Sequence, residues 1–206
     1  MKTRNVGILI FNDAEVLDFA GPFEVFSVTS QINNHEPFNV FTVSKTTETI
    51  SAVNGLKVVP DFSIDEHPPI DILIISGGQG TRKLLNDAEV VNWVKKIHST
   101  NELTLGICSA SRIIGKAGMI DGKNFCTHHE VYDHMEEIVP LAIPQKERRF
   151  IQSSEKLYTS GGISAGIDLS FHIVEKLLGK EVAIRTARYM EYSLVDEPHP
   201  SLVLEL

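Results

Sequence analysis

An apolar run changes into a helical pattern at a cysteine in the stretch Leu103-Thr-Leu-Gly-Ile-Cys108-Ser-Ala-Ser-Arg-Ile-Ile-Gly115. The first five residues are typical of a buried strand, and a helix is expected to begin immediately after Cys108. Gly106, Ser109 and Ala110 are small enough for a tight turn of the kind seen in the nucleophile elbow of hydrolases. We therefore expect an α/β fold with Cys108 at the carboxyl edge of the sheet, where open α/β sheets bind ligands.

The rest of the first half repeats this alternation of strand and helix. Strands are predicted over residues 6–11, 38–43 and 70–75, and helices over 22–28, 87–99 and 109–117. Asp87 is a good N-cap for the second of these helices. Because the strands are apolar along most of their length, they suit a mostly parallel sheet that is covered by helices on both faces.

The second half is less regular but continues the same architecture. Its sequence pattern predicts strands over 149–152 and 156–159 and helices over 163–178 and 182–192. Gly179 separates these two helices. No internal repeat, low-complexity stretch or Pro/Ser-rich linker interrupts the chain. We therefore expect one domain over residues 1–206, with residues 196–206 as an extended C-terminal arm.

The composition is that of an ordinary globular protein and disfavours several partners. Of the 206 residues, 42% are hydrophobic, and 19 Lys and Arg face 27 Asp and Glu, a net charge of −8. Such a charge argues against a binder of nucleic acid or of an anionic membrane. No apolar run approaches the roughly 18 residues of a membrane helix, and the run 6–11 is too short for a signal peptide. We expect a cytoplasmic protein.

Two cysteines, Cys108 and Cys126, exclude a disulfide framework and direct attention to a single reactive thiol. Exposed backbone N–H groups and the dipole of the following helix would favour the thiolate of Cys108, which is the nucleophilic form. The alternative is a buried structural cysteine, as most free cysteines are. Cys126 has no comparable turn beside it, so we expect it to be a packing residue.

Two further segments supply candidate partners for this thiol. Gly77 and Gly78 follow the strand predicted over 70–75, and glycines allow backbone N–H groups to approach a developing negative charge, as in an oxyanion hole. A turn that requires positive φ explains them equally well. Asp18 lies among apolar residues, where desolvation would raise its pKa and suit it to act as an acid. Otherwise it is an ordinary helix cap or a solvated turn residue.

Two other patterns resemble a serine-hydrolase motif and a zinc site, but their spacing does not support either. Ser164 lies in a G-x-S-x-G motif, and Asp168, His172 and His199 follow in the order of a hydrolase triad, but no strand follows to carry separate catalytic loops. His129 and His134 stand five positions apart, about 140° around a helix, so they cannot share a face as zinc ligands do. We predict neither a serine hydrolase nor a metal site.

Five motifs together resemble the ThiJ/PfpI superfamily, which is similar to class I glutamine amidotransferases in fold. They are Asp18-Phe-Ala-Gly-Pro22, Ser76-Gly-Gly78, Gly106-Ile-Cys-Ser109, Thr127-His128 and Thr159-Ser-Gly-Gly-Ile-Ser-Ala-Gly-Ile-Asp168. The resemblance is greatest to the branch that contains isocyanide hydratase and the ligand-like domains of AraC-type regulators.

This resemblance implies a flavodoxin-like three-layer α/β sandwich, commonly dimeric, that needs no cofactor or metal. It implies Cys108 as nucleophile, Asp18 as general acid/base and Ser109 as a group that steadies the intermediate, with Gly77, Gly78 and His128 around the substrate. The reaction implied is hydration of a small isocyanide to an N-substituted formamide through a covalent cysteine adduct.

Departures from the family pattern leave the substrate open. Ser109 replaces the threonine of the hydratase pattern, and His129 replaces a tryptophan, which makes the pocket wall smaller and more polar. The residue after Cys108 is not histidine, which disfavours the proteolysis of PfpI proteases. A sensor of small molecules or oxidative stress, without the helix-turn-helix region of an AraC-type regulator, is the alternative. A glyoxalase or deglycase using the same thiol is another.

Overall fold

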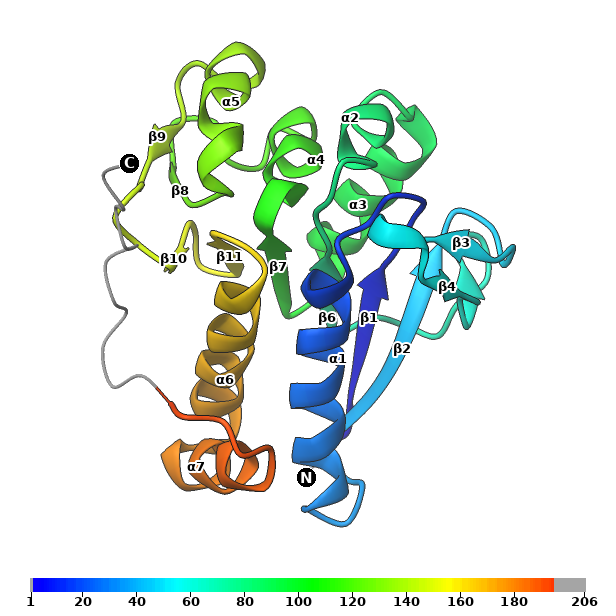
Figure 1. Ribbon diagram of the computed structural model, residues 1–206, viewed down its shortest axis with the longest axis vertical. Coiled ribbons are helices and arrows are strands. Elements are labelled where there is room, and N and C mark those ends of the chain that lie inside the picture. The colour runs from blue at the N-terminus through cyan, green and yellow to red at the C-terminus, as the bar shows by residue number, and fades with distance from the viewer. Residues whose placement is uncertain (1, 195–206) are drawn as a thin grey trace.

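Seven strands form one sheet in the order β10-β11-β7-β6-β1-β2-β5, as the computed structural model shows (Figure 1). All neighbours pair in parallel except β10 and β11. The strands are β1 (Arg4–Leu9), β2 (Phe38–Ser44), β5 (Phe62–Ser63), β6 (Ile72–Ile75), β7 (Leu103–Ile107), β10 (Phe150–Gln152) and β11 (Leu157–Ser160). The expected mostly parallel α/β sheet is confirmed.

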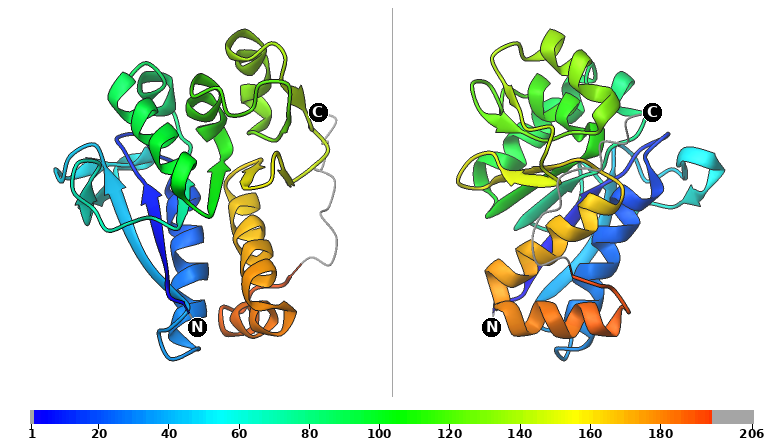
Figure 2. Two further views of the ribbon diagram at one scale, coloured as in Figure 1. Left: turned by 180° about the vertical axis from the view of Figure 1, so that it is seen from behind. Right: turned by 60° about the vertical axis from the view of Figure 1, so that its left-hand side comes forward.

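Helices cover both faces of this sheet. On one face lie α1 (Val16–Gln31), α6 (Ser164–Leu178) and α7 (Lys180–Tyr189), and on the other lie α3 (Ala88–Thr100) and α4 (Ser111–Lys116) (Figures 1 and 2). Shorter elements lie around the carboxyl edge: α2 (Thr81–Leu84), α5 (Tyr132–Ile138), the pair β3 (Ile50–Ser51) and β4 (Lys57–Val58), and the pair β8 (Asn124–Phe125) and β9 (Ile143–Pro144). Three-residue 3-10 helices begin at Val53, Cys108 and His129.

The sequence pattern explains most of these elements. β6 and β7 are buried along their whole length, as expected for strands of a sheet that helices cover on both faces. Asp87 caps α3 as expected, because its carboxylate accepts hydrogen bonds from the amides of Glu89 and Val90. Gly179 separates α6 from α7 with a φ of 92°.

Helix α1 departs from its predicted start. It was expected to begin at Pro22, which lacks the N–H group that a helix interior uses. It begins at Val16 instead, and Pro22 lies inside it. Phe19, Val25 and Phe26 on this helix are buried in the core, so tertiary packing outweighs the local preference of proline. The earlier start places Asp18 in the first helical turn.

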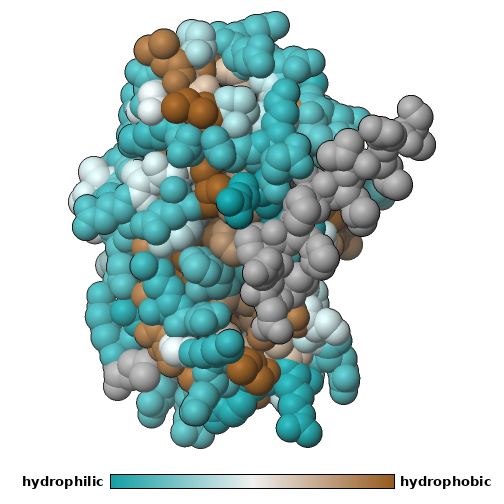
Figure 3. Space-filling view, turned by 90° about the vertical axis from the view of Figure 1, so that its left-hand side faces the viewer, coloured by the Kyte–Doolittle hydropathy of each residue, from teal (hydrophilic) through white to brown (hydrophobic). Residues whose placement is uncertain are grey.

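The structure describes residues 2–194, and the arm expected over 196–206 lies outside this range. No helix within 2–194 has both the length and the apolar character that crossing a bilayer requires. The face in Figure 3 is largely hydrophilic, with apolar residues in small groups separated by polar ones.

Candidate active site

Cys108 stands at the point where β7 passes into a 3-10 helix and then into α4. Its φ is 57°, a left-handed conformation that costs a residue with a Cβ roughly 1–2 kcal/mol. The turn is held by Thr127, whose hydroxyl donates a 2.9 Å hydrogen bond to the Cys108 carbonyl. The strand-to-helix elbow expected from the sequence is therefore present, and the rest of the fold supports its strain.

Gly162 lies directly against this cysteine. A Cβ at Gly162 would lie 2.2 Å from the Cβ of Cys108 and 2.7 Å from its Sγ. The glycine also has a φ of 97°, so both its conformation and its surroundings exclude a side chain. Gly162 is not among the residues predicted for the site, although the Gly161-Gly162 pair before a helix is a signal for it.

Asp18 reaches the elbow from the first turn of α1 and is fully buried. Its carboxylate accepts hydrogen bonds from the amide of Ile163 at 2.7 Å and from the amide of Gly77 at 3.1 Å. Burial raises the pKa of Asp18 to about 6, although these two amides and the Cys108 side chain oppose the shift. Asp18 is therefore neither a helix cap nor a solvated turn residue but a buried acid beside the thiol.

The pKa of the Cys108 thiol is raised, which overturns the expectation of a stabilised thiolate. Burial is the main cause, and the negative charge of Asp18 adds to it. The Ser109 amide lowers the pKa of the thiol, as a helix N-terminus should, but by less. Burial and the charge of Asp18 therefore favour the protonated thiol, and the two groups interact as a pair.

Gly77 and Gly78 do not offer free N–H groups to a substrate, contrary to their predicted oxyanion role. The Gly77 amide donates to Asp18, and the Gly78 amide donates a 2.8 Å hydrogen bond to Oγ of Ser109. The Ser109 hydroxyl in turn donates to the Gly78 carbonyl at 3.0 Å. These groups fix the positions of Asp18 and of the elbow relative to β6.

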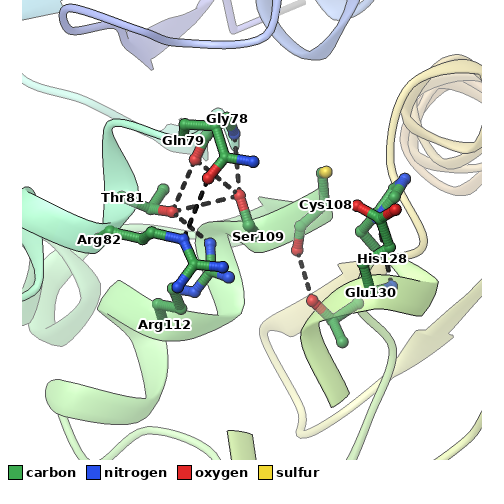
Figure 4. Close-up of polar contacts among 10 residues, drawn as sticks. Gly78, Gln79, Thr81, Arg82, Cys108, Ser109, Arg112, His128 and Glu130 are labelled. Atoms are coloured by element: carbon green, nitrogen blue, oxygen red, sulfur yellow. Dashed lines mark hydrogen bonds and ion pairs between the residues drawn. The ribbon is translucent and has the colours of Figure 1, made fainter. Parts of the chain in front are cut away.

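A cavity of about 290 Å³ opens over the Cys108 thiol. It brings together Cys108, Ser109, Gly78 and His128 of the predicted site, whereas Asp18 and Gly77 lie behind the thiol and do not line it. Figure 4 shows His128 on one side of Cys108. The remaining lining residues are Glu15, Val53, Gln79, Arg82, Arg112, Glu130, Val131 and Ile163.

His128 is half-buried and interacts with its own loop. Its Nδ1 accepts a 3.4 Å hydrogen bond from the Glu130 amide, and the Glu130 carboxylate lies 3.9 Å from the same nitrogen. Burial lowers the pKa of His128, and the neighbouring His129 adds to the effect. Burial thus favours the neutral imidazole, which lines the cavity without a hydrogen bond to Cys108 among the contacts of residues 2–194.

The serine-triad residues are not assembled for catalysis. Asp168 forms an ion pair with Arg149 and accepts a hydrogen bond from Tyr192. Ser164 accepts a hydrogen bond from Arg149, while the ring of His172 packs beside Phe150. His199 lies outside the described residues.

Cys126 and His134 have structural partners away from the thiol. Cys126 is buried and donates to the carbonyls of Gln145 and Arg148, and burial raises its pKa to about 12. This environment agrees with the expected packing role. His134 accepts a 2.9 Å hydrogen bond from Nε of Arg112, so it lies beneath the elbow and not in a cluster with His129.

The family model for DJ-1/PfpI matches residues 4–176. The chain belongs to the DJ-1/PfpI family. Among solved structures, a THiJ/PfpI family protein from Pseudomonas syringae superimposes with a TM-score of 0.84 at 24% identity, over all of this chain and 80% of that one. Drosophila melanogaster DJ-1beta superimposes with a TM-score of 0.78 at 18% identity, over 94% of this chain and all of that one.

Curated DJ-1/PfpI relatives of the chain include proteins of two functional classes. Isonitrile hydratase of Pseudomonas putida is 27% identical over 188 residues, which cover 91% of this chain and 78% of the hydratase. The HTH-type transcriptional regulator GbdR of Pseudomonas aeruginosa is 22% identical over 93% of this chain. The chain spans about half of that regulator, 52% of its length. The predicted superfamily is confirmed, and its members include both an enzyme and regulators.

Proposed function

We propose that this protein is a cysteine-dependent hydratase of small isocyanides, forming N-substituted formamides. The observation that carries the proposal is the coupled pair of a buried acid, Asp18, and an elbow thiol, Cys108, behind a cavity of about 290 Å³. Similarity to an isonitrile hydratase over 91% of the chain supports the same reaction. A small cavity with one nucleophile and one acid suits addition of water to a small, linear electrophile.

The raised pKa of Cys108 gives Asp18 two successive roles. The carboxylate first takes the thiol proton, which generates the nucleophile only when substrate is bound. Sγ then bonds to the terminal carbon of R–N≡C, and Asp18 returns the proton to that carbon, which leaves the thioimidate R–N=CH–S–Cys. Water adds to this carbon, the C–S bond breaks, the nitrogen gains a proton and the thiol is restored as R–NH–CHO leaves.

Turnover of an aryl isocyanide, followed by the absorbance of the formamide, tests this function. We expect turnover by the wild type, no turnover by Cys108→Ala, and near-normal turnover by Cys126→Ala. The last variant is a matched control because it removes the other buried thiol. Equal rates for Cys108→Ala and the wild type, or no turnover by either, would refute the proposal.

Sensing of a small molecule or an oxidant by the same cavity is the alternative function, favoured by the similarity to GbdR. A glyoxalase or deglycase would use the same thiol and is separated only by a substrate panel. Peroxide treatment followed by mass spectrometry tests the oxidant sensor. Selective oxidation of Cys108 at micromolar peroxide would support it, whereas the raised thiol pKa leads us to expect slow oxidation.

We further propose that the protein works in the cytoplasm as a homodimer, without a cofactor, with a small molecule as its partner and without contact to a membrane. Light scattering tests the assembly: a dimer has twice the 22.9 kDa of one chain. A mass of one chain at micromolar concentration would contradict it.

A further inference from the structure

Arg112 is a buried cation at the elbow whose partners are neutral. It lies on α4, one helical turn after Cys108, and is only 2% exposed. Its Nε donates to Nδ1 of His134 at 2.9 Å, and its Nη1 donates to Oγ1 of Thr81 at 3.0 Å. The remaining N–H groups of the guanidinium have no acceptor among residues 2–194.

No carboxylate of the described residues forms an ion pair with this guanidinium. His134 does not replace one, because burial and the charge of Arg112 lower the pKa of His134 and it accepts a hydrogen bond as a neutral ring. A buried cation without an anionic partner is unfavourable in the free protein. An anion that enters the cavity would relieve this cost.

Arg82 places a second cation beside the first. Its guanidinium and that of Arg112 lie next to each other on the Ser109 side of the site (Figure 4), and both line the cavity. Arg82 is exposed, and its Nε donates to the Gln79 amide oxygen at 3.0 Å. Burial lowers the pKa of Arg112 and the nearby charge of Arg82 lowers it further, while Cys108 raises it.

One acidic residue of the cavity, Glu130, lies at its other end. Glu130 lies beside His128, beyond Cys108 from the two arginines (Figure 4). Glu15 also lines the cavity, and its amide donates a 2.9 Å hydrogen bond to the Gly77 carbonyl, next to Gly78. The two arginines, on α2 and α4, therefore lie across the thiol from Glu130.

We infer that the substrate carries a carboxylate, which the Arg112 and Arg82 guanidinium groups bind while its electrophilic carbon lies at the Cys108 thiol. The planar guanidinium matches a carboxylate with paired N–H donors. This inference rests on the proposed function for the identity of the electrophile, which would make the substrate a small isocyano acid. The carboxylate preference itself does not depend on that identity.

The first experiment compares isocyanoacetate with its neutral amide, isocyanoacetamide. For the wild type we expect kcat/KM to be at least tenfold higher for the carboxylate. Arg112→Gln should remove this preference and Arg82→Gln should reduce it. Lys83→Gln is the matched control, because Lys83 is an exposed cation next to Arg82 that does not line the cavity, and it should leave the preference unchanged.

The second experiment needs no turnover. Alkylation of Cys108 by iodoacetate and by iodoacetamide, quantified by mass spectrometry, compares two reagents that differ mainly in charge. We expect the iodoacetate rate divided by the iodoacetamide rate to fall at least tenfold in Arg112→Gln, with a smaller fall in Arg82→Gln. If Arg112 acted only on the thiol, its replacement would change both rates equally, and an unchanged ratio in both variants overturns the inference.

The two experiments separate failure of the inference from failure of the proposed function. Turnover of both isocyanides without a charge preference would refute the carboxylate site and leave the hydratase intact. An iodoacetate preference lost in Arg112→Gln, without turnover of any isocyanide, would refute the hydratase and support the carboxylate site. Because Arg82 is exposed, its variant keeps the test valid if Arg112→Gln does not fold.

Discussion

Asp18 and Cys108 each have a raised pKa because both are buried. The charge of Asp18 raises the pKa of Cys108 further, whereas the hydrogen bond from the Cys108 side chain lowers that of Asp18. Both shifts favour the protonated, less reactive thiol in the free protein. This arrangement differs from a thiolate stabilised by a helix N-terminus, which reacts with many electrophiles. Under the proposed function, proton transfer within the pair would set which electrophiles react.

The pH dependence of catalysis should report the single proton of this pair. Below the Asp18 pKa of about 6 the carboxyl is protonated and cannot accept the thiol proton. We expect kcat/KM to rise between pH 5 and pH 7 with a midpoint near 6, and to stay level to pH 9 because the pKa of Cys108 lies above its ordinary value. A midpoint near 8.5 would indicate a free, uncoupled thiol.

The same acid should lower stability at neutral pH. The pKa of Asp18 rises from 3.8 to about 6 on folding, so its stabilising contribution is present below pH 4 and is lost as the pH passes 6. The shift corresponds to about 3 kcal/mol. In urea denaturation, the free energy of unfolding of Asp18→Asn relative to the wild type should increase by up to that amount between pH 4 and pH 7.5. A difference in the free energy of unfolding that stays constant over this pH range would contradict the raised pKa of Asp18.

At the scale of elements, the site depends on close contact between the elbow and the segment that leads into α6. Gly162 touches Cys108, and the following Ile163 has a φ of 51°, which is rare for a β-branched residue. That conformation directs the Ile163 amide to Asp18. Two strained backbone turns, on different elements, thus hold the acid and the thiol together.

Gly162→Ala should remove activity, with Gly122→Ala as the matched control. Both glycines have positive φ, at 97° and 66°, so each alanine adds roughly 1–2 kcal/mol of backbone strain. Only at Gly162 would the new Cβ collide with Cys108, whereas nothing lies within 4 Å at Gly122. We expect at least a tenfold loss of kcat/KM in the first variant alone, measured beside thermal unfolding. Equal effects would show that the contact is unimportant.

At the scale of the whole molecule, hydrophobic periodicity predicted the alternating strands and helices, and the motif order predicted Asp18 beside Cys108. The amides of Gly77 and Gly78 are not free as expected but donate to Asp18 and Ser109, because the direction of an amide depends on neighbouring loops and not on residue type. Burial raises the pKa of the Cys108 thiol, against the expected thiolate, and this burial could not be derived from the local sequence. Arg112 was missed, although a cation inside an otherwise apolar helix was a visible signal.

The charge of the molecule predicts its behaviour toward nucleic acid. With a net charge of −8, this chain should not bind duplex DNA at 100 mM salt in a fluorescence-anisotropy titration up to 10 µM protein. Repulsion between two polyanions is the reason. Saturable binding that weakens with salt would contradict this prediction and would favour a regulator over an enzyme.

The packing of α1 against α6 sets the position of Asp18 relative to its hydrogen-bond partner, the Ile163 amide. Asp18 lies on α1 and its amide partner, Ile163, immediately precedes α6, while a Cβ at Gly21 would lie 2.8 Å from Ile167. A small residue along this seam sets how far the two helices are apart. Substitutions at this contact would change the pKa of Asp18 by small amounts while Asp18 and Cys108 themselves stay the same. Proteins with this fold could differ in reactivity by this route.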